Sequence, residues 1–311
     1  MAKPRNKILD YLVYLGMRLF AMFVHMFPPR ASYRTAAFLG LLIHRFDHRH
    51  RRIAVEHLRR SFPDWSEAEI QRVAKESLKS LVYLGLEVLL TTRLITPLTW
   101  HRYVRLANLS ETLRILLERR TGVILVTGHY GNFELIGYTM ATLGFPSVSV
   151  ARPLDNPYVN EFLQGVRERT GQSILHKKGA VASIEDVLAA RGTLAFLADQ
   201  DAGRKGLFVD FFGRRASTYK SIGLMAREFD APIVVGYGRR LGTDFRFEMG
   251  VQRVIHPHEW KDKPDPLEWI TREFSAALET IIRSAPEQYL WVHRRWKHRP
   301  DGQPKPPDGI A

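Results

Sequence analysis

The stretch from Val123 to Glu134 contains the residue types best suited to chemistry. It places His129 after an apolar, β-branched run and five residues before Glu134. A histidine at a turn can act as a general base when a nearby carboxylate orients its ring. The spacing alone is weak evidence, because 12 histidines and 32 acidic residues in a chain of 311 residues produce about one such pair by chance. The alternative is a buried histidine beside an acid that stabilises the start of a helix.

The position of this pair is more informative than its spacing. The run Val123–Val126 predicts a buried strand, and the apolar residues that follow have helical spacing: Leu135, Ile136, Met140 and Leu143. His129 is therefore expected at the carboxyl end of a strand, where open α/β sheets bind their ligands.

Two further predicted strands end in polar residues. Arg152 and Asn156 follow the strand 147–151, and Asp199 and Asp201 follow the strand 193–198. The carboxyl ends of parallel strands meet at one edge of a sheet, so we expect these residues on the same edge as His129. From their types alone, the two aspartates could orient arginines, cap the strand end or hold a metal.

The pattern of elements predicts an α/β protein with a helical N-terminal region. Residues 1–118 read as all-helical, with a capping box at Ser66 and Glu69 that starts a long helix towards Leu90. From residue 122, strands (122–127, 147–151, 173–176, 193–198) alternate with helices (132–143, 157–169, 180–190). Alternation of this kind predicts a mostly parallel central sheet flanked by helices. A strand or extended loop at 207–212, strands at 232–237 and 245–254, and helices at 220–229 and 266–284 complete the prediction.

Composition excludes several kinds of site. The chain has no cysteine, which excludes thiolate nucleophiles, disulfides and cysteine-ligated metals. It also lacks a Gly-x-Ser-x-Gly elbow, a P-loop and a His-Glu-x-x-His motif, the usual signs of serine hydrolases, nucleotide sites and zinc proteases. His256 and His258 are interpreted as part of a surface turn rather than a metal pair.

The charge of the chain indicates an anionic partner. The formal net charge is +14 and the pI is near 10.1. Eight arginines lie between residues 30 and 60, and a second basic cluster spans His293–Arg299. Both lie near apolar segments, which favours a membrane surface over nucleic acid.

The segment Ile8–Phe27 is interpreted as a retained membrane anchor. It is mostly apolar and close to the length that spans a bilayer, but Asp10, Arg18 and His25 interrupt it. A charge in the middle of a span costs about 2.5–3.5 kcal/mol, which favours a helix that lies in the interface or is partly inserted. The alternative is an apolar helix that covers the core of a soluble domain. We therefore divide the chain into an anchor helix (1–30), a helical subregion (31–118), an α/β core (119–300) and a polar, proline-rich tail (301–311).

Five motifs together resemble one family. They are His129–Glu134, Arg152–Pro157, Asp199–Asp201, Phe211–Gly213 and Pro286–Lys297. In this order they resemble the lipid A biosynthesis acyltransferases, the lauroyl- and myristoyl-transferring enzymes, within the lysophospholipid/glycerolipid acyltransferase superfamily. The likeness covers about residues 10 to 297 of the chain.

The resemblance implies acyl transfer from a thioester, of acyl carrier protein or CoA, to a hydroxyl of a phosphorylated glycolipid such as a lipid A precursor. It implies a place at the cytoplasmic face of the bacterial inner membrane. His129 would deprotonate the hydroxyl, and Glu134 would hold the imidazole as the third member of a triad does. Direct attack on the thioester needs no cysteine or serine nucleophile, and no cofactor, metal or nucleic acid is expected.

The same resemblance suggests further roles. Amide groups around Gly131, or a side chain of Arg152 or Arg215, are the open candidates for oxyanion donors. Arg152, Arg167 and Arg214 are the candidates for acceptor phosphates, because a guanidinium suits bidentate phosphate contacts. The supporting residues are Asn132, Asn156, Asp199 and Asp201.

Two rival functions remain open. One is acyl transfer to another membrane lipid, such as a mannosylated phosphoinositide, a lysophospholipid or an amino-lipid. The other is a non-enzymatic basic protein that binds a membrane surface or nucleic acid, with binding that weakens steeply with salt.

Overall fold

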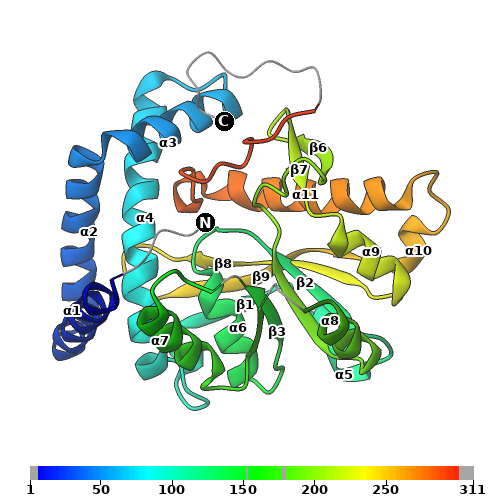
Figure 1. Ribbon diagram of the computed structural model, residues 1–311, viewed down its shortest axis with the longest axis horizontal. Helices are drawn as coiled ribbons and strands as arrows, with labels where there is room; N and C mark the ends of the chain where they lie inside the picture. Colours follow the sequence, from blue (N-terminus) through cyan, green and yellow to red (C-terminus); the bar gives the residue numbers. More distant parts are fainter. Residues whose placement is uncertain (1–5, 152, 177–179, 301–311) are drawn as a thin grey trace.

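The computed structural model describes residues 6–151, 153–176 and 180–300 and has a seven-stranded sheet at its centre (Figure 1). The strand order is β1-β9-β8-β2-β5-β3-β4. In the described part of the chain, neighbouring strands run parallel except for β8 and β9, which are antiparallel. The predicted mostly parallel α/β sheet is confirmed. Its strands are β1 Val104–Ala107, β2 Val123–Thr127, β3 Val148–Ala151, β4 Ser173–His176, β5 Thr193–Leu197, β8 Ile233–Arg240 and β9 Phe247–Ile255.

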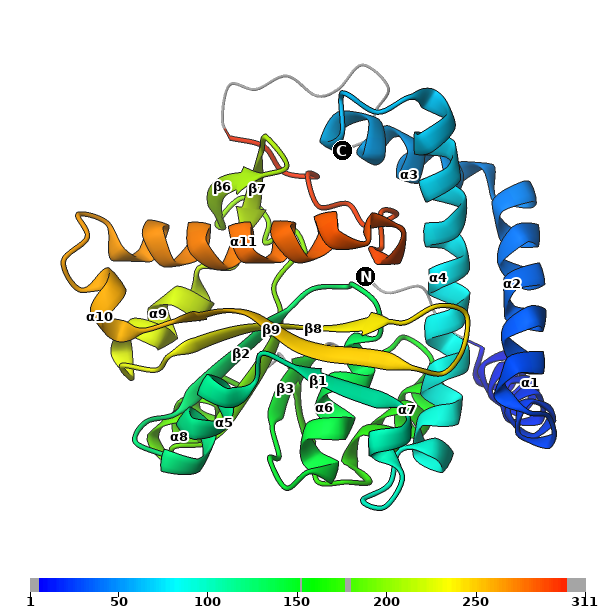
Figure 2. The same cartoon turned by 180° about the vertical axis from the view of Figure 1, so that it is seen from behind.

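Helices cover both faces of the sheet. Helix α11 (Pro266–Ser284) and helix α9 (Ser221–Glu228) lie on one face, while α5 (Ser110–Glu118) and α6 (Phe133–Thr142) lie on the opposite face (Figures 1 and 2). The β-branched strands β2 and β8 are buried on both sides, as expected for parallel strands between two helical layers. The remaining helices of the α/β region are α7 Pro157–Glu168, α8 Ala180–Ala189 and α10 Pro257–Trp260.

Four helices form the N-terminal region and stand at one side of the sheet (Figures 1 and 2). They are α1 Lys7–Met26, α2 Pro29–Phe46, α3 His48–Ser61 and α4 Glu67–Leu94. Ser66 and Glu69 form the capping box that the sequence predicts at the start of α4. Leu86 and Leu90 of α4 pack into a core with residues of α2, α6 and β9. The helical region is therefore continuous with the core of the sheet.

One prediction of the fold is wrong in detail. Residues 1–118 are not all helical, because β1 pairs in parallel with β9 at the edge of the sheet. A four-residue strand with Arg105 exposed carries no periodic signal that distinguishes it from a loop. The strand or extended loop predicted at 207–212 is confirmed as strand β6 (Leu207–Phe211), which pairs with β7 (Arg214–Thr218) in a hairpin separate from the central sheet.

A buried charged network joins the N-terminal helices to the sheet. Glu87 of α4 forms an ion pair with Arg240 of β8 and accepts a 2.6 Å hydrogen bond from the hydroxyl of Tyr33 on α2. It also accepts a 3.0 Å hydrogen bond from Asn132, which caps α6 by accepting from the amide of Leu135. A buried charge is tolerated when it is paired and hydrogen-bonded. The network fixes the start of α6, which follows the loop that holds His129.

Candidate active site

His129 forms its closest side-chain contact with Asp199. Its Nδ1 lies 2.8 Å from Oδ1 of Asp199, and its backbone amide donates to Oδ2 of the same carboxylate over 2.8 Å. The Asp199 side chain is fully buried, whereas one tenth of the His129 side chain is exposed. A buried carboxylate thus holds both the backbone and the ring of His129.

The register of the sheet explains this contact. Strands β2 and β5 are parallel neighbours, and Thr127 pairs with Leu197. His129 and Asp199 each follow two residues after this pair, so they leave the same edge of the sheet side by side. The prediction that the two strand ends meet is confirmed.

The carboxylate of Asp199 sets the tautomer of His129. Burial alone would raise the pKa of the Asp199 carboxyl, but His129 and its hydrogen bonds hold that pKa well below its usual range. The ionised carboxylate accepts from Nδ1–H, which leaves Nε2 of His129 as the lone-pair nitrogen. The side-chain amide nitrogen of Gln200 lies 3.4 Å from this Nε2.

Glu134 does not contact His129. Its carboxylate instead forms a bidentate ion pair with Arg167 of α7, at 2.8 Å from Nε and 2.5 Å from Nη2. Among the described residues, the ring of His129 is held by Asp199, so the predicted role of Glu134 in holding the imidazole is wrong. Glu134 lies in the first turn of α6, beyond the turn at Gly131, and spacing along the chain does not define where such a side chain points.

His293 is a site residue that the sequence analysis placed only in a basic cluster. Its ring centroid lies 4.3 Å from that of His129, in an edge-on arrangement. Burial and then the nearby His129 lower the pKa of His293 to about 4, against a smaller opposite effect of Asp199. His293 is therefore neutral near pH 7 and adds a polar, uncharged ring beside His129.

A short backbone pairing brings His293 to the site. The amide of Leu290 donates to the carbonyl of His129 over 3.0 Å, and the amide of Gly131 donates to the carbonyl of Gln288 over 2.9 Å. These contacts join the loop after β2 to the irregular segment after α11. Such a tertiary pairing leaves no local pattern in the sequence, so the position of His293 beside His129 could not be predicted.

The amide of Gly131 is not available as an oxyanion donor, because Gln288 already accepts it. The next amide, of Asn132, donates to the carbonyl of Gly238 over 2.7 Å. Gly131 has a φ of +56°, and a Cβ there would lie 2.1 Å from the carbonyl oxygen of Gly238. The glycine is needed for this close approach of two backbones, and the prediction of its amide as an oxyanion donor is wrong.

In the described part of the chain, the side-chain hydrogen bonds and ring contacts of His129 do not include the other candidate arginines. Arg152 lies outside the described residues. Arg215 is an exposed residue of the β6–β7 hairpin. Arg214 of the same hairpin is largely buried, donates to Ser61 of α3 over 3.0 Å and lies 3.5 Å from the ring centroid of Trp296.

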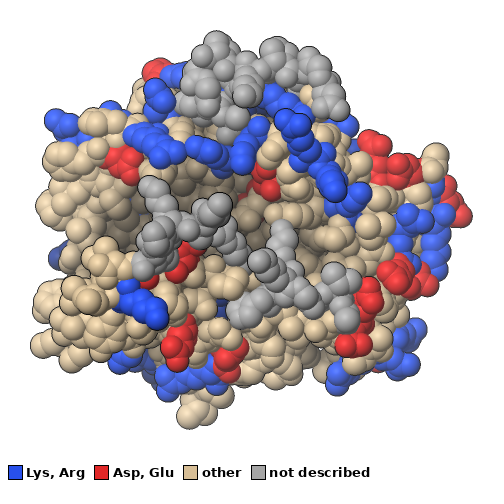
Figure 3. Space-filling model, viewed as in Figure 1, with Lys and Arg blue, Asp and Glu red and all other residues tan. Residues whose placement is uncertain are grey.

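Arg214 belongs to a group of three arginines. Burial and then the charges of Arg60 and Arg299 lower the pKa of Arg214 to about 9. In Figure 3, Lys and Arg side chains gather over the upper half of the face shown. A bound anion beside Arg214 would relieve this repulsion.

The remaining supporting residues have structural roles. Asn132 caps α6 and contacts Glu87, as described above. Asn156 caps α7 and donates to the carbonyl of Asp10 on α1 over 2.9 Å, which links these two helices. Asp201 lies 2.6 Å from Nδ1 of His298 and thus holds the C-terminal segment rather than an arginine.

His129, Asp199 and His293 present ligand atoms within 4.8 Å of one another. Both carboxylate oxygens of Asp199 already accept hydrogen bonds from His129. A hydrogen-bonded histidine–carboxylate pair therefore accounts for the contacts of Asp199. The predicted surface turn at His256–His258 leads into α10, and His256 Nε2 lies 2.8 Å from a carboxylate oxygen of Glu111.

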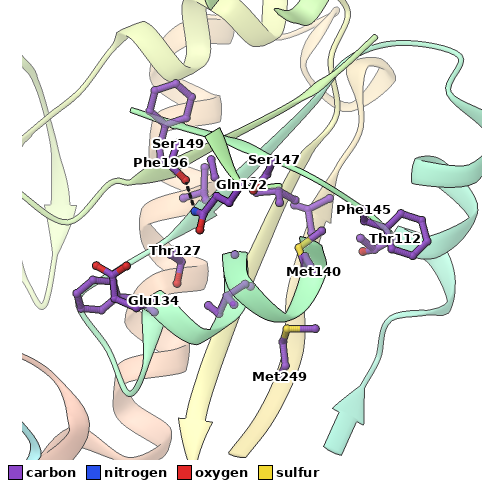
Figure 4. A pocket seen from close by; sticks show the side chains of 18 of the residues that line it. Thr112, Thr127, Glu134, Met140, Phe145, Ser147, Ser149, Gln172, Phe196 and Met249 are labelled. Atoms are coloured by element: carbon purple, nitrogen blue, oxygen red, sulfur yellow. Dashed lines mark hydrogen bonds between the residues drawn. The ribbon is translucent and has the colours of Figure 1, made fainter. Parts of the chain in front are cut away.

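Two apolar cavities flank the site. The core pocket lies between α5, α6 and the sheet, has a volume of about 140 Å³, and is lined mostly by apolar residues. Thr127 and Glu134 lie at one end of it, and Phe145 and Thr112 lie at the other (Figure 4). Gln172 lies between these ends and donates to Ser149 over 2.8 Å (Figure 4).

The second cavity, called the helix groove, lies between α1, α2, α4 and α7 and has a volume of about 660 Å³. Its walls include Phe20, Phe23, Leu81, Gly85 and Phe162. A third, much smaller cavity beside His129 shares Phe133 with the core pocket and Leu81 and Leu84 with the helix groove. His129 thus borders a small cavity that shares lining residues with two apolar spaces.

Comparison with known proteins gives a consistent result. The family model of the bacterial lipid A biosynthesis acyltransferases matches residues 2–298. The chain is 29% identical over 303 residues to the lipid A biosynthesis lauroyltransferase of Escherichia coli (strain K12), covering 94% of each chain. It is 26% identical over 303 residues to the lipid A biosynthesis palmitoleoyltransferase of the same strain, covering 94% of this chain and 93% of that protein. It is 24% identical over 294 residues to the lipid A biosynthesis myristoyltransferase of that strain, covering 90% of this chain and 85% of that protein.

Proposed function

Because the chain belongs to the bacterial lipid A biosynthesis acyltransferases, we propose that it moves a fatty acyl group from a thioester to a hydroxyl of a phosphorylated lipid A precursor. The donor is acyl carrier protein or CoA, and the thioester is a co-substrate rather than a cofactor. The observation that carries the proposal is the His129–Asp199 pair, which lies between two apolar cavities. A base beside two apolar spaces suits a reaction in which the acyl donor and the lipid acceptor each carry hydrocarbon chains.

His129 is the general base in this proposal. Its Nε2 takes the proton of the acceptor hydroxyl while the oxygen attacks the thioester carbonyl. Asp199 stabilises the resulting imidazolium through Nδ1–H, as the carboxylate of a catalytic triad does. The tetrahedral intermediate then loses the thiolate as the C–S bond breaks, and the imidazolium returns its proton to the leaving sulfur.

Gln200 is our candidate for the oxyanion donor. Its amide nitrogen lies 3.4 Å from Nε2 of His129, and Gln200 is an exposed residue. The attacking oxygen has to approach that Nε2, so the amide is close to the position where the carbonyl oxygen gains charge. In this proposal Gln200 replaces Gly131 as the oxyanion donor, because the amide of Gly131 already donates to Gln288.

The donor acyl chain occupies the core pocket in this proposal. The pocket is narrow and mostly apolar, and Thr127 and Phe133 line its end nearest His129. Burial of an alkyl chain in such a space contributes about 0.8 kcal/mol for each CH₂ group. The depth of the pocket would then select the length of the transferred chain.

The acceptor phosphates are assigned to Arg214 and its neighbours. An anion beside Arg214 would be favoured, because burial and then the charges of Arg60 and Arg299 lower the pKa of Arg214 to about 9. Arg167 is already paired with Glu134, and we assign this pair to the wall between the two cavities. Arginine suits the phosphate role because its fork makes bidentate contacts.

We also propose that α1 and α2 hold the protein at the cytoplasmic face of the inner membrane. Helix α1 is long and apolar enough to cross a membrane, and it is largely exposed. Most of the large hydrophobic residues that the described chain exposes lie in its first two helices. An exposed apolar surface of this kind next to arginine-rich α3 suits an anionic membrane.

A competition assay tests the choice of acceptor. The purified full-length protein would receive one acyl thioester together with equal amounts of a lipid A precursor and a lysophospholipid in detergent micelles. We expect mass spectrometry to find the acyl group on the lipid A precursor at least tenfold more often. Acylation confined to the lysophospholipid would contradict the proposed acceptor, and no acylation of any lipid would contradict the enzymatic proposal.

A further inference from the structure

We infer that the helix groove binds an acyl chain of the acceptor lipid, while the core pocket receives the donor chain. Among the described residues, Glu134 alone lines both cavities. The small cavity at His129 borders the core pocket through Phe133 and the groove through Leu81 and Leu84. The inference rests on the proposed function and adds to it a binding site for the second substrate.

The lining of the groove defines the chemistry of its occupant. Of the described side chains that line it, only Ser32, Thr35 and Glu134 carry oxygen or nitrogen atoms, and the others are aliphatic, aromatic, glycine or the thioether Met17. Such a surface offers hydrogen-bond partners at few points and favours a hydrocarbon chain. Its volume of about 660 Å³, against about 140 Å³ for the core pocket, suits the bulkier of two lipid substrates.

The groove is also open to the apolar surface of α1. Phe20, Phe23 and Phe27 line it, and these residues are 40%, 52% and 40% exposed. A lipid that resides in a bilayer can enter from this side without passing through water. The donor arrives differently, because acyl carrier protein and CoA bring one chain from the aqueous phase. The open groove therefore suits the acceptor, and the narrow core pocket suits the donor.

Gly85 gives direct experimental access to the groove. It lies in α4 and lines the groove, and a Cβ added there would meet nothing within 4 Å. A Gly85→Phe substitution would fill the groove without a steric clash at its base. Gly16 of α1 is the matched control, since its Cβ would also meet nothing within 4 Å and it does not line the groove. Both substitutions replace a helical glycine, so their effects on helix stability are similar.

The first test is steady-state kinetics with acceptors in mixed micelles. We expect Gly85→Phe to raise KM for the fully lipidated acceptor at least tenfold, with KM for the acyl thioester within twofold of wild type. Gly16→Phe should leave both values within twofold. For an acceptor with shortened acyl chains, wild type and Gly85→Phe should have the same KM. An unchanged acceptor KM in Gly85→Phe, or equal effects of both substitutions, would overturn the inference.

A binding test separates this inference from the enzymatic proposal, since it needs no turnover. A lipid A precursor with a diazirine near the end of one acyl chain would be photo-crosslinked to the His129→Ala protein. We expect crosslinked peptides from the walls of the groove, around Phe23, Val88 and Phe162. Crosslinks from core-pocket residues such as Phe145 and Phe196 would overturn the assignment, whatever the outcome of the activity assays.

Discussion

Asp199 gives both of its oxygens to one residue, His129, and is itself fully buried. A buried carboxylate without partners would be strongly disfavoured, so these two hydrogen bonds account for its ionised state. The same bonds fix the ring and the tautomer of His129. Glu134 lies only five residues after His129 in the sequence, but it forms an ion pair with Arg167. The ring of His129 is held instead by Asp199, which follows a neighbouring strand.

The Asp199→Asn substitution tests whether the charge of Asp199 stabilises the imidazolium of His129. An amide can accept the hydrogen bond of Nδ1–H but carries no charge to stabilise the imidazolium. We expect kcat to fall by about 10³-fold or more, as removal of the triad carboxylate charge does in serine proteases. Steady-state kinetics would measure it. Asp201→Asn is the matched control, because Asp201 lies two residues after Asp199 but holds His298 instead of His129. The kcat of this variant should stay within about tenfold of wild type.

The ion pair of Glu134 and Arg167 gives a second prediction. Each side chain is less than one fifth exposed, so removal of one partner leaves the other charge poorly solvated. We expect Glu134→Gln and Arg167→Gln each to lower the free energy of unfolding, with a coupling energy of about 1–3 kcal/mol in the double-mutant cycle. Urea denaturation of the four proteins would measure it, and additive effects would show that the pair is not coupled.

His293 predicts a dependence of stability on pH. Its pKa is lowered from 6.5 to about 4 in the folded protein, so the unfolded chain binds more protons between these values. Stability should therefore rise with pH through this window, by about 3 kcal/mol from this residue. Urea denaturation between pH 4 and 7 should show a flatter profile for His293→Gln, and His258→Gln is the control. An equal slope in His293→Gln would refute this contribution.

The direction of the strands could be predicted from the sequence, but their order in the sheet could not. The convergence of His129 and Asp199 follows from parallel strands, which alternation with helices predicts. Their direct contact depends on β5 being the neighbour of β2, and strand order is a long-range property that local patterns do not report. The edge strand β1, the pairing of residues 288–290 with the loop after β2, and hence His293, also arise from tertiary contacts.

The buried ion pair of Glu87 and Arg240 joins helix α4 to strand β8, and Glu87 supports the start of α6 through Asn132. Glu87→Gln leaves a guanidinium buried without a counter-charge, which we expect to cost about 3–5 kcal/mol in the free energy of unfolding. The double substitution Glu87→Met with Arg240→Met should recover much of this loss. Chemical denaturation is the measurement, and a change below about 1 kcal/mol in Glu87→Gln would contradict the role of the network.

The whole molecule combines three features that one local motif could not indicate. An exposed apolar helical pair lies beside an arginine-rich helix, Glu134 lines two apolar cavities, and His129 lines a smaller cavity that shares residues with both. The net charge of +14 and the apolar N-terminal segment allowed the membrane surface to be predicted from composition. The cavities depend on packing between distant helices and strands, so the sequence could not assign their linings.

The central claim is that His129 is the base for acyl transfer from a thioester to a lipid hydroxyl. The most direct measurement is the mass of a lipid A precursor after incubation with an acyl thioester and purified protein. Wild type should add the mass of one acyl group, with loss of the hydroxyl proton, while His129→Ala should give less than about one thousandth of the wild-type rate. Folding of the variant would be checked by its thermal unfolding. Transfer by a folded His129→Ala protein at the wild-type rate would contradict the account.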